Sequence, residues 1–430
     1  MRITPFALAA CSSLAVAQAD YPAVFVANNG NLEGSVSTMR IESSGVLTYV
    51  SKTVTGTRSS TSQPCPGCNT YAIDITPDGR FLATAHASGN TTENLTVYAV
   101  APDGSLTVVE ELPLAQGGLD IQWVSNDLLA YPLTDLSQTN QVRLYHLDED
   151  NELTQVDSAD AGTFCTSIAL HPNRRWLYAN DSFANTVRVF DTQGGSLTLV
   201  QTQSLPVSGV AVEVTPDGRT LFAAGGISAG GNAFAGYTID PADGTLSALP
   251  GSPFTSPGSS PKGFSFSGDG AYMYVSHGTD ATIRAFSLDA SGIPASLGFS
   301  YDIGFQGSLR EMDSLGNILF ALDESTAIDG LRGAYSFSIN PGTGDFTPFP
   351  NSPVDTNGTS PNDLTVWAAA VGCNPADIAS PFNVLDLGDL QAFVKGFLAG
   401  DPIADLAPPQ GVLDLADVQA FVTSFSAGCP

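Results

Sequence analysis

One phrase recurs along the chain and decides the fold. Ile73–Ala85 reads IDITPDGRFLATA and Val212–Ala224 reads VEVTPDGRTLFAA, while Ile168–Asn180 (IALHPNRRWLYAN) and Phe264–Ser276 (FSFSGDGAYMYVS) follow the same pattern. Each copy has two runs rich in β-branched and aromatic residues around a tight-turn signal such as Pro-Asp-Gly. Such a pattern predicts a β-hairpin.

The hairpins lie inside longer repeating units. Weaker copies of the phrase begin at Ile121 and Glu311, and the units end on a shared apolar position 44–59 residues apart: Leu47, Leu106, Leu153, Leu197, Leu246, Ile293 and Phe346. Seven units of this length with β patterns predict an all-β, seven-bladed β-propeller with one four-stranded sheet per blade. A two-sheet sandwich would not explain the repeat.

The two ends of the repeat region complement each other. Ala23–Asn28 (AVFVAN) matches the second strand of a unit, and no first strand precedes it. Near the other end, Ser360-Pro361 and Asp363–Val366 match Ser260-Pro261 and Gly263–Phe266. We therefore expect the late segment to supply the inner strand of the first blade, which closes the ring and leaves no unpaired inner edge.

Composition narrows the classes of partner. The 430 residues carry 43 acidic and 15 basic side chains, for a formal net charge of −28. Nucleic acids and anionic membranes are bound through basic patches, so this balance argues against both as partners. With 43% hydrophobic residues, the chain can bury a large core and is not intrinsically disordered.

The first 19 residues resemble a targeting segment. Arg2 is followed by an apolar run over Phe6–Val16 and by Ala17-Gln18-Ala19, which predicts a signal peptide cleaved before Asp20. Leu8-Ala9-Ala10-Cys11 leaves a lipoprotein signal as the alternative. No other apolar run reaches the ~18–20 residues that span a bilayer. We expect a protein that is secreted or displayed at the cell surface.

Five cysteines remain after such cleavage, and an exported protein can form disulfides. We expect a disulfide between Cys65 and Cys68, which lie in a turn-rich segment, with metal or redox chemistry as the alternative. Cys373 and Cys429 bracket the last segment, and we expect a second disulfide between them. Cys165 is left over, and a lone cysteine is most often a buried apolar residue.

The hairpin pattern, with Tyr178-Ala179-Asn180 and Tyr274-Val275-Ser276 in the second strand, resembles the lactonase-type seven-bladed propellers. These include 6-phosphogluconolactonases and proteins with YVTN-type repeats, and the resemblance covers about residues 22–370. It implies hydrolysis of a lactone by residues near the inner strands. Those enzymes carry Pro-His-x-His and Pro-Arg-His runs before two inner strands, and a glutamate after a second strand. Here these places read Cys68-Asn69-Thr70-Tyr71, Cys165-Thr166-Ser167 and Asp181.

The hairpin alignment also brings acidic residues to one place. Asp74, Glu213 and Glu311 align on the inner strands. One interpretation is an acidic ring that binds a cation, a small molecule or a sugar at the central funnel. The favoured alternative is that these carboxylates hydrogen-bond backbone groups between blades. The candidate catalytic residues are Glu213, Glu311, Arg310 and Asp181.

Residues 371–430 form a different repeat. Ala376–Phe393 and Ala404–Phe421 lie 28 residues apart, each leads into an amphipathic helix, and they share three aspartate positions: Asp377, Asp386 and Asp389, and Asp405, Asp414 and Asp417. The paired units and the Gly428-Cys429 ending resemble a small α-helical dockerin-like tail. That resemblance implies weak calcium binding by the six aspartates and a protein partner. The alternative is that Asp389 and Asp417 only cap or charge helix starts.

Two functional hypotheses follow for a chain with a signal peptide (1–19), a propeller (20–370) and a tail (371–430). The first is an exported binding or scaffold module, tethered or sorted outside the cell by its tail. The alternative is a lactonase-like hydrolase of a sugar lactone, similar to the 6-phosphogluconolactonases, with a degenerate active site. Apart from calcium in the tail, we expect no cofactor.

Overall fold

The computed structural model describes residues 21–87, 93–134, 140–225, 231–304, 309–324 and 333–368, together with residues 376, 385, 387–399, 404, 406–407 and 413–428. The chain divides into two compact units, Ala19–Ala369 and the combination of Met1–Gln18 with Ala370–Pro430. Each is described by itself below.

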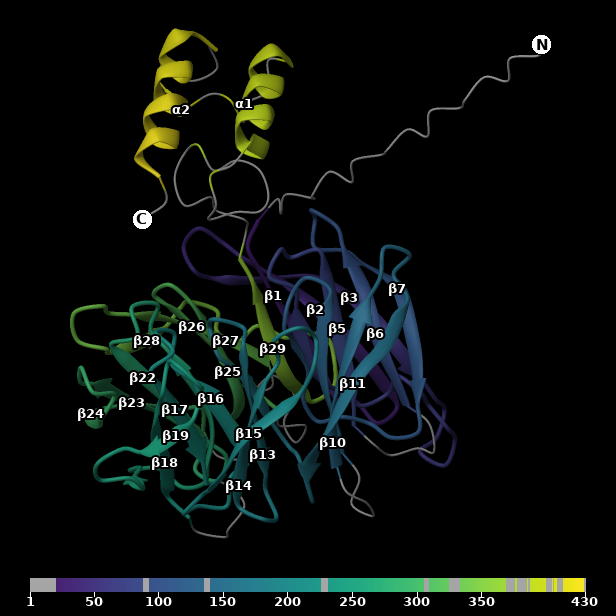
Figure 1. Ribbon diagram of the computed structural model, residues 1–430, viewed down its shortest axis with the longest axis vertical. Coiled ribbons are helices and arrows are strands. Elements are labelled where there is room, and N and C mark those ends of the chain that lie inside the picture. Colours follow the sequence, from purple (N-terminus) through teal and green to yellow (C-terminus); the bar gives the residue numbers. More distant parts are fainter. Residues whose placement is uncertain are drawn as a thin grey trace. The chain divides into compact units, whose positions relative to one another are not determined.

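The first unit consists of seven antiparallel sheets, each with its strands in order from the centre of a ring outward, which confirms the seven-bladed propeller (Figure 1). The first sheet contains β29 (Pro361–Trp367), β1 (Ala23–Asn28), β2 (Glu33–Ile41) and β3 (Leu47–Thr57). The second contains β4 (Thr70–Ile75), β5 (Phe81–His86), β6 (Glu93–Val100) and β7 (Leu106–Leu114). The third contains β8 (Gln122–Trp123), β9 (Leu128–Leu133), β10 (Asn140–Leu147) and β11 (Leu153–Gly162).

The remaining four sheets repeat this order. The fourth contains β12 (Ile168–Leu170), β13 (Trp176–Asp181), β14 (Thr186–Asp191) and β15 (Thr198–Ser204). The fifth contains β16 (Ala211–Val214), β17 (Thr220–Ala224), β18 (Ala233–Ile239), β19 (Leu246–Ala248) and β20 (Phe254–Thr255), which pairs with β18. The sixth contains β21 (Pro261–Phe266), β22 (Tyr272–His277), β23 (Thr282–Leu288) and β24 (Pro294–Asp302). The seventh contains β25 (Leu309–Leu315), β26 (Ile318–Asp323), β27 (Gly333–Ile339) and β28 (Phe346–Pro348).

The first blade joins strands from opposite ends of the propeller. β29 pairs with β1 in antiparallel register, with Val24 opposite Val366 and Phe25 opposite Thr365 (Figure 1). The expected closure is therefore confirmed. Because a propeller blade needs a complete sheet, this pairing completes the ring and leaves the inner edge occupied.

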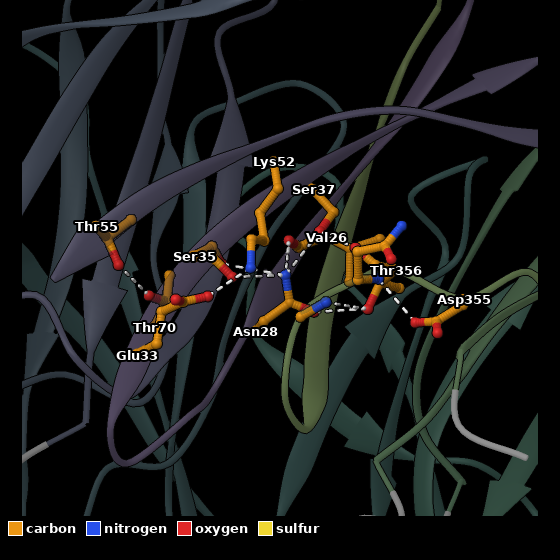
Figure 2. A network of polar contacts seen from close by, with 12 residues as sticks. Val26, Asn28, Glu33, Ser35, Ser37, Lys52, Thr55, Thr70, Asp355 and Thr356 are labelled. Atoms are coloured by element: carbon orange, nitrogen blue, oxygen red, sulfur yellow. Dashed lines mark hydrogen bonds and ion pairs between the residues drawn. The ribbon is translucent and has the colours of Figure 1, made fainter. Parts of the chain in front are cut away.

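Side chains reinforce the same closure (Figure 2). The Asn28 amide donates to Ser37 Oγ at 2.9 Å, and its Oδ1 accepts from Thr356 Oγ1 at 2.9 Å. Ser37 Oγ in turn donates to the Thr356 carbonyl at 2.6 Å. All three residues are buried. Their hydrogen bonds connect β1 and β2 to the segment that leads into β29. Each of the polar atoms joined in this way has a hydrogen-bond partner, as buried polar groups require.

Apolar side chains fill the spaces between blades. The second strands β1, β13 and β17 are buried along their whole length because both faces meet a neighbouring blade, whereas the outer strand β3 is half-exposed. One cluster joins Phe25 and Trp367 of the first blade to Ile73 and Tyr98 of the second. The core is therefore a ring of inter-blade contacts rather than a single centre.

The geometry of the recurring hairpin turn explains why its sequence contains aspartate and glycine. In the second blade, Thr76 Oγ1 donates to Asp78 Oδ1 at 2.8 Å, and Gly79 follows with φ of 70°. A Cβ on Gly79 would lie 2.5 Å from the Trp367 ring nitrogen of the neighbouring blade. Glycine is required both for the left-handed backbone and for the close approach of that blade.

The second unit contains two helices, α1 (Leu387–Ala399) and α2 (Leu415–Ala427). They pack through Phe393 and Phe421, whose rings stack with centroids 4.2 Å apart. The two amphipathic helices expected from the sequence are confirmed. Phe397, Val418 and Phe425 pack against this pair, whereas Val394 and Val422 remain about half-exposed at 47% and 54%.

Within the described residues, no helix combines the length and apolar character needed to cross a membrane.

Removing the Asn28 side chain should weaken the closed ring. Asn28→Ala leaves Ser37 and Thr356 with lost partners in a buried site, so we expect the free energy of unfolding to fall by about 1–3 kcal/mol. Denaturant unfolding monitored by tryptophan fluorescence measures this change. Thr48→Ala, at an exposed residue of β3, is the matched control. Equal stability of the two variants would contradict the closing role of the network.

Candidate functional site

A cavity of about 580 Å³ lies where the inner strands of the blades meet. All seven inner strands contribute side chains to its wall, including Asp74 of β4, Gln122 of β8, Ile168 of β12 and Glu213 of β16. Its size falls in the range of small-molecule sites. This cavity is the central funnel expected from the sequence.

Carboxylates dominate the polar lining of the funnel. Six of them contribute to the wall: Asp74, Asp120, Glu213, Glu311, Asp313 and Asp363. Three were expected from the sequence, and Asp120, Asp313 and Asp363 were missed. A usable signal was present, because Asp74-Ile75, Asp120-Ile121 and Asp363-Leu364 all place an aspartate directly before an aliphatic residue of an inner-strand segment.

Four of these carboxylates join neighbouring blades. In each, one oxygen accepts the N–H of the following residue and the other accepts an N–H of the next inner-strand segment. The inter-blade bonds are Asp363 to Ile73 N at 2.8 Å, Asp74 to Trp123 N at 2.7 Å, Asp120 to Ile168 N at 2.7 Å, and Asp313 to Val366 N at 3.1 Å. Asp74 therefore has the structural role that the sequence left open.

Serine side chains make similar links elsewhere in the ring. Ser167 Oγ accepts from Val212 N at 3.3 Å, and Ser314 Oγ donates to the Phe266 carbonyl at 2.6 Å. Hydroxyl groups thus connect the fourth blade to the fifth and the seventh to the sixth.

Burial changes the acidity of the bridging carboxyls. Desolvation raises the pKa of Asp74 and of Asp120 to about 7 and that of Asp313 to about 6, although the accepted N–H groups act in the opposite direction. The pKa of Asp363 is raised well above its ordinary value, first by burial and then by the charges of Glu311 and Asp120. Asp74, Asp120 and Asp313 therefore exchange protons near neutral pH.

Glu213 lies on β16 and faces the funnel. Burial, followed by the negative charges of Glu311, Asp313 and Asp120, raises its pKa well above the ordinary value. Burial and the nearby negative charges both favour the protonated form of this carboxyl, which can donate a proton. Glu213 is thus a candidate acid, with Glu311 as its charged neighbour.

The position of Glu311 differs from the sequence alignment by two residues. Asp74 pairs with Ala83 and Glu213 with Phe222, but in the seventh blade Asp313, not Glu311, pairs with the corresponding Phe320. The reason is the hairpin, because only Gly316 and Asn317 separate β25 from β26. Glu311 precedes Asp313 by two residues on β25 and still lines the funnel.

One cation lines the funnel among the described side chains. Lys262 Nζ lies 3.0 Å from Glu324 Oε1 in a half-buried ion pair. Arg310 lies on β25, but its side chain is outside the described residues. The structure therefore brings Lys262, Glu213 and Glu311 to one cavity.

Asp181 occupies the place of the family's glutamate but has a different environment. Its carboxylate accepts from Thr163 N and Thr163 Oγ1, and from the N–H groups of Phe164, Phe183 and Ala184. Burial alone would raise the pKa of Asp181, but these hydrogen bonds together outweigh it and lower the pKa. Asp181 is not among the described residues that line the funnel; it fixes two loops, whose Phe164 and Phe183 rings stack with centroids 4.6 Å apart.

The cysteines can be placed in part. Cys65 and Cys68 form the expected disulfide, and Cys165 is a buried free thiol. Cys373 and Cys429 lie outside the described residues. No group of three or more His, Cys, Asp or Glu side chains arranged to hold a metal ion occurs in the described part of the chain.

Of the six tail aspartates, Asp377, Asp386 and Asp405 lie outside the described residues. Asp389 is buried in α1. Asp414 caps α2, and Asp417 accepts the N–H groups of Leu406, Ala407 and Asp414. Asp414 and Asp417 thus act at a helix start, while calcium binding by the tail stays a prediction.

Comparison with known proteins confirms the lactonase-type resemblance. A family model described as a lactonase, seven-bladed β-propeller, matches residues 130–298. A 6-phosphogluconolactonase of Serratia proteamaculans is 28% identical over 250 residues, which cover 53% of this chain and 63% of the relative. One from Photorhabdus laumondii is 27% identical over 240 residues, covering 52% of this chain and 68% of the relative. The match thus spans less than two thirds of the Serratia protein.

Solved structures share the fold at low identity. A crystal structure from Bacteroides uniformis superposes with a TM-score of 0.64 at 15% identity, covering 81% of this chain and 100% of the other. A Lactobacillus plantarum structure gives 0.63 at 14% identity, covering 81% and 99%. These likenesses show the propeller fold alone.

The curated relatives correct one expectation. They are named as enzymes, which contradicts our first hypothesis of a binding or scaffold module tethered by the tail. That hypothesis is wrong. It rested on the missing histidine and arginine positions of the family.

The raised pKa values predict that the propeller is more stable in mild acid. The folded state retains protons on Asp74, Asp120 and Asp313 that the unfolded chain releases near its ordinary pKa of about 4. Stability should therefore fall as the pH rises from about 4 to about 7.

Thermal midpoints across this pH range measure the effect. Asp74→Asn should make the fall shallower, since it removes one titrating group. Asp217→Asn, which changes an exposed turn residue, should leave the slope unchanged. A midpoint that rises steadily from pH 4 to pH 7 would show that these carboxyls are ionised in the fold.

Proposed function

We propose that the propeller hydrolyses a sugar lactone in its central funnel. The observation that carries this proposal is the pair formed by Glu213, whose pKa is strongly raised, and Glu311, whose charge contributes to that rise, in a cavity of small-molecule size. The similarity to proteins named 6-phosphogluconolactonase supports the same reaction class.

The reaction adds water across the acyl C–O bond of the lactone ring. Water attacks the carbonyl carbon, a negative charge develops on the carbonyl oxygen, and the ring oxygen leaves as a hydroxyl group. Such a reaction needs a base for the water, an acid for the leaving oxygen and a donor for the oxyanion.

The two glutamates can divide the acid and base roles. Glu311 accepts the proton of the attacking water, and the protonated Glu213 gives a proton to the leaving ring oxygen. The proton gained by Glu311 then returns to Glu213 through solvent. Two acids whose mutual charge places the proton on one of them are suited to this division, as in other paired carboxyl sites.

Lys262 supplies the positive charge in this proposal. Its ammonium group lines the same cavity, and its ion pair with Glu324 fixes its position. An ammonium group in a cavity shielded from water stabilises a developing oxyanion more strongly than it would in bulk solvent. This set replaces the histidine and arginine positions that the chain lacks relative to the family.

The signal peptide over residues 1–19, export from the cytoplasm and calcium in the tail remain predictions from the sequence. Their residues lie wholly or partly outside the described part of the chain.

Glu213→Gln should abolish proton donation while keeping the side-chain size. We expect kcat for a sugar lactone to fall by about 100-fold or more. A pH indicator assay follows the acid released during hydrolysis. Asp217→Asn, a surface change in the same blade, is the control with unchanged turnover. Full activity of a folded Glu213→Gln protein would remove Glu213 from the reaction.

A further inference from the structure

We infer that the funnel accepts an uncharged sugar lactone and discriminates against the same lactone carrying a phosphate ester. This inference rests on the proposed lactone hydrolysis and specifies its substrate class. It follows from which hydrogen-bonding groups line the cavity and which of them already have partners.

The charge of the lining opposes an anion. Six carboxyl groups face the cavity, against the single described cation Lys262, whose ammonium is already 3.0 Å from the Glu324 carboxylate. From neutral pH upward, where Asp74, Asp120 and Asp313 are at least partly ionised, a phosphate dianion entering the funnel meets like charges, which weaken its binding.

The donors that usually hold phosphate are also occupied. Phosphate sites use arginine forks, lysines or clusters of free backbone N–H groups. Here the N–H groups of Ile73, Trp123 and Ile168 already donate to the bridging aspartates. These three backbone N–H groups of the described funnel wall form hydrogen bonds between blades. They are therefore not available to a phosphate group.

Two buried acceptor oxygens in residues of the funnel wall also offer nothing to a phosphate. Asn362 Oδ1 and Gln122 Oε1 have no hydrogen-bond partner among the described residues, and both residues line the funnel. Asn362 is only 2% exposed, and its amide nitrogen already donates to the Tyr71 carbonyl. Both oxygens are covered by neighbouring atoms, and neither would gain a hydrogen bond from a phosphate dianion, which offers only acceptors.

An aromatic pair adjoins the same cavity. Phe164 contributes to the funnel wall and stacks on Phe183, which is 59% exposed. The faces of these rings carry partial negative charge and attract the weakly positive C–H bonds of a sugar ring. The loop bonds to Asp181 hold both rings in place. The aromatic face therefore suits a neutral pyranose-type ring.

The test compares two substrates that differ only in the phosphate. We expect kcat/KM for an aldono-1,5-lactone to exceed that for its 6-phosphate ester by about tenfold or more. The value for the phosphate ester should rise with ionic strength because salt screens like-charge repulsion, while the value for the uncharged lactone stays constant. Equal or higher kcat/KM for the phosphate ester would overturn the inference.

A variant pair isolates the charge effect. Tyr71→Arg adds a cation to the funnel wall, and Tyr71→Gln is the matched change without charge. Tyr71→Arg should raise kcat/KM for the phosphate ester relative to the uncharged lactone, and Tyr71→Gln should leave the ratio near that of the unmodified protein. A ratio unaffected by the added cation would mean that funnel charge does not set the preference.

Binding of non-reactive sugars separates this inference from the proposed hydrolysis. Saturation-transfer NMR with a free pyranose and its 6-phosphate reports which one enters the funnel, even if neither lactone is hydrolysed. Binding of the uncharged sugar without lactone turnover would overturn the hydrolysis and support the charge preference. Binding of neither sugar, or preferential binding of the phosphate, would overturn the preference itself.

Discussion

The structure depends on aspartates that each accept two backbone N–H groups, one from their own inner-strand segment and one from the next. A ring of separate sheets has no continuous backbone ladder at its centre, so the blades must be joined by other groups. Asp74, Asp120, Asp313 and Asp363 supply these joints with bonds of 2.7–3.1 Å across the junctions. Carboxylate acceptors suit this task because one side chain can satisfy two donors.

The aspartates that join the blades also set the acidity of the carboxyl groups in the funnel. Carboxyls that face one cavity lose hydration and repel one another, so their pKa values rise toward neutrality. The structural groups Asp313 and Asp120 thereby add to the effect of burial in raising the pKa of Glu213. Their negative charges also disfavour anions, and the backbone donors used in the joints are no longer available to a phosphate. Stability and ligand preference therefore arise from the same side chains.

The closure at the first blade is the second constraint. β29 comes from the far end of the propeller sequence and completes the sheet of β1. It also carries Asn362 and Asp363 into the funnel wall, next to groups from β4. The site is thus incomplete until the ring is closed, because part of its lining arrives only with the last strand.

The sequence by itself determined the number of blades, the hairpin positions, the closing strand and the disulfide between Cys65 and Cys68. These features follow from local turn chemistry and a regular repeat, both of which are visible along the chain. It also identified Asp74 and Glu213, because they lie in strongly repeated hairpins. Only the tertiary structure decided that Asp313 occupies the place assigned to Glu311, since a two-residue turn shifted the register. It alone showed that Asp120, Asp313 and Asp363 join blades and that Asp181 holds two loops. Those roles depend on donors from segments about 17 to 290 residues away, and no local pattern encodes which N–H group a carboxylate will meet.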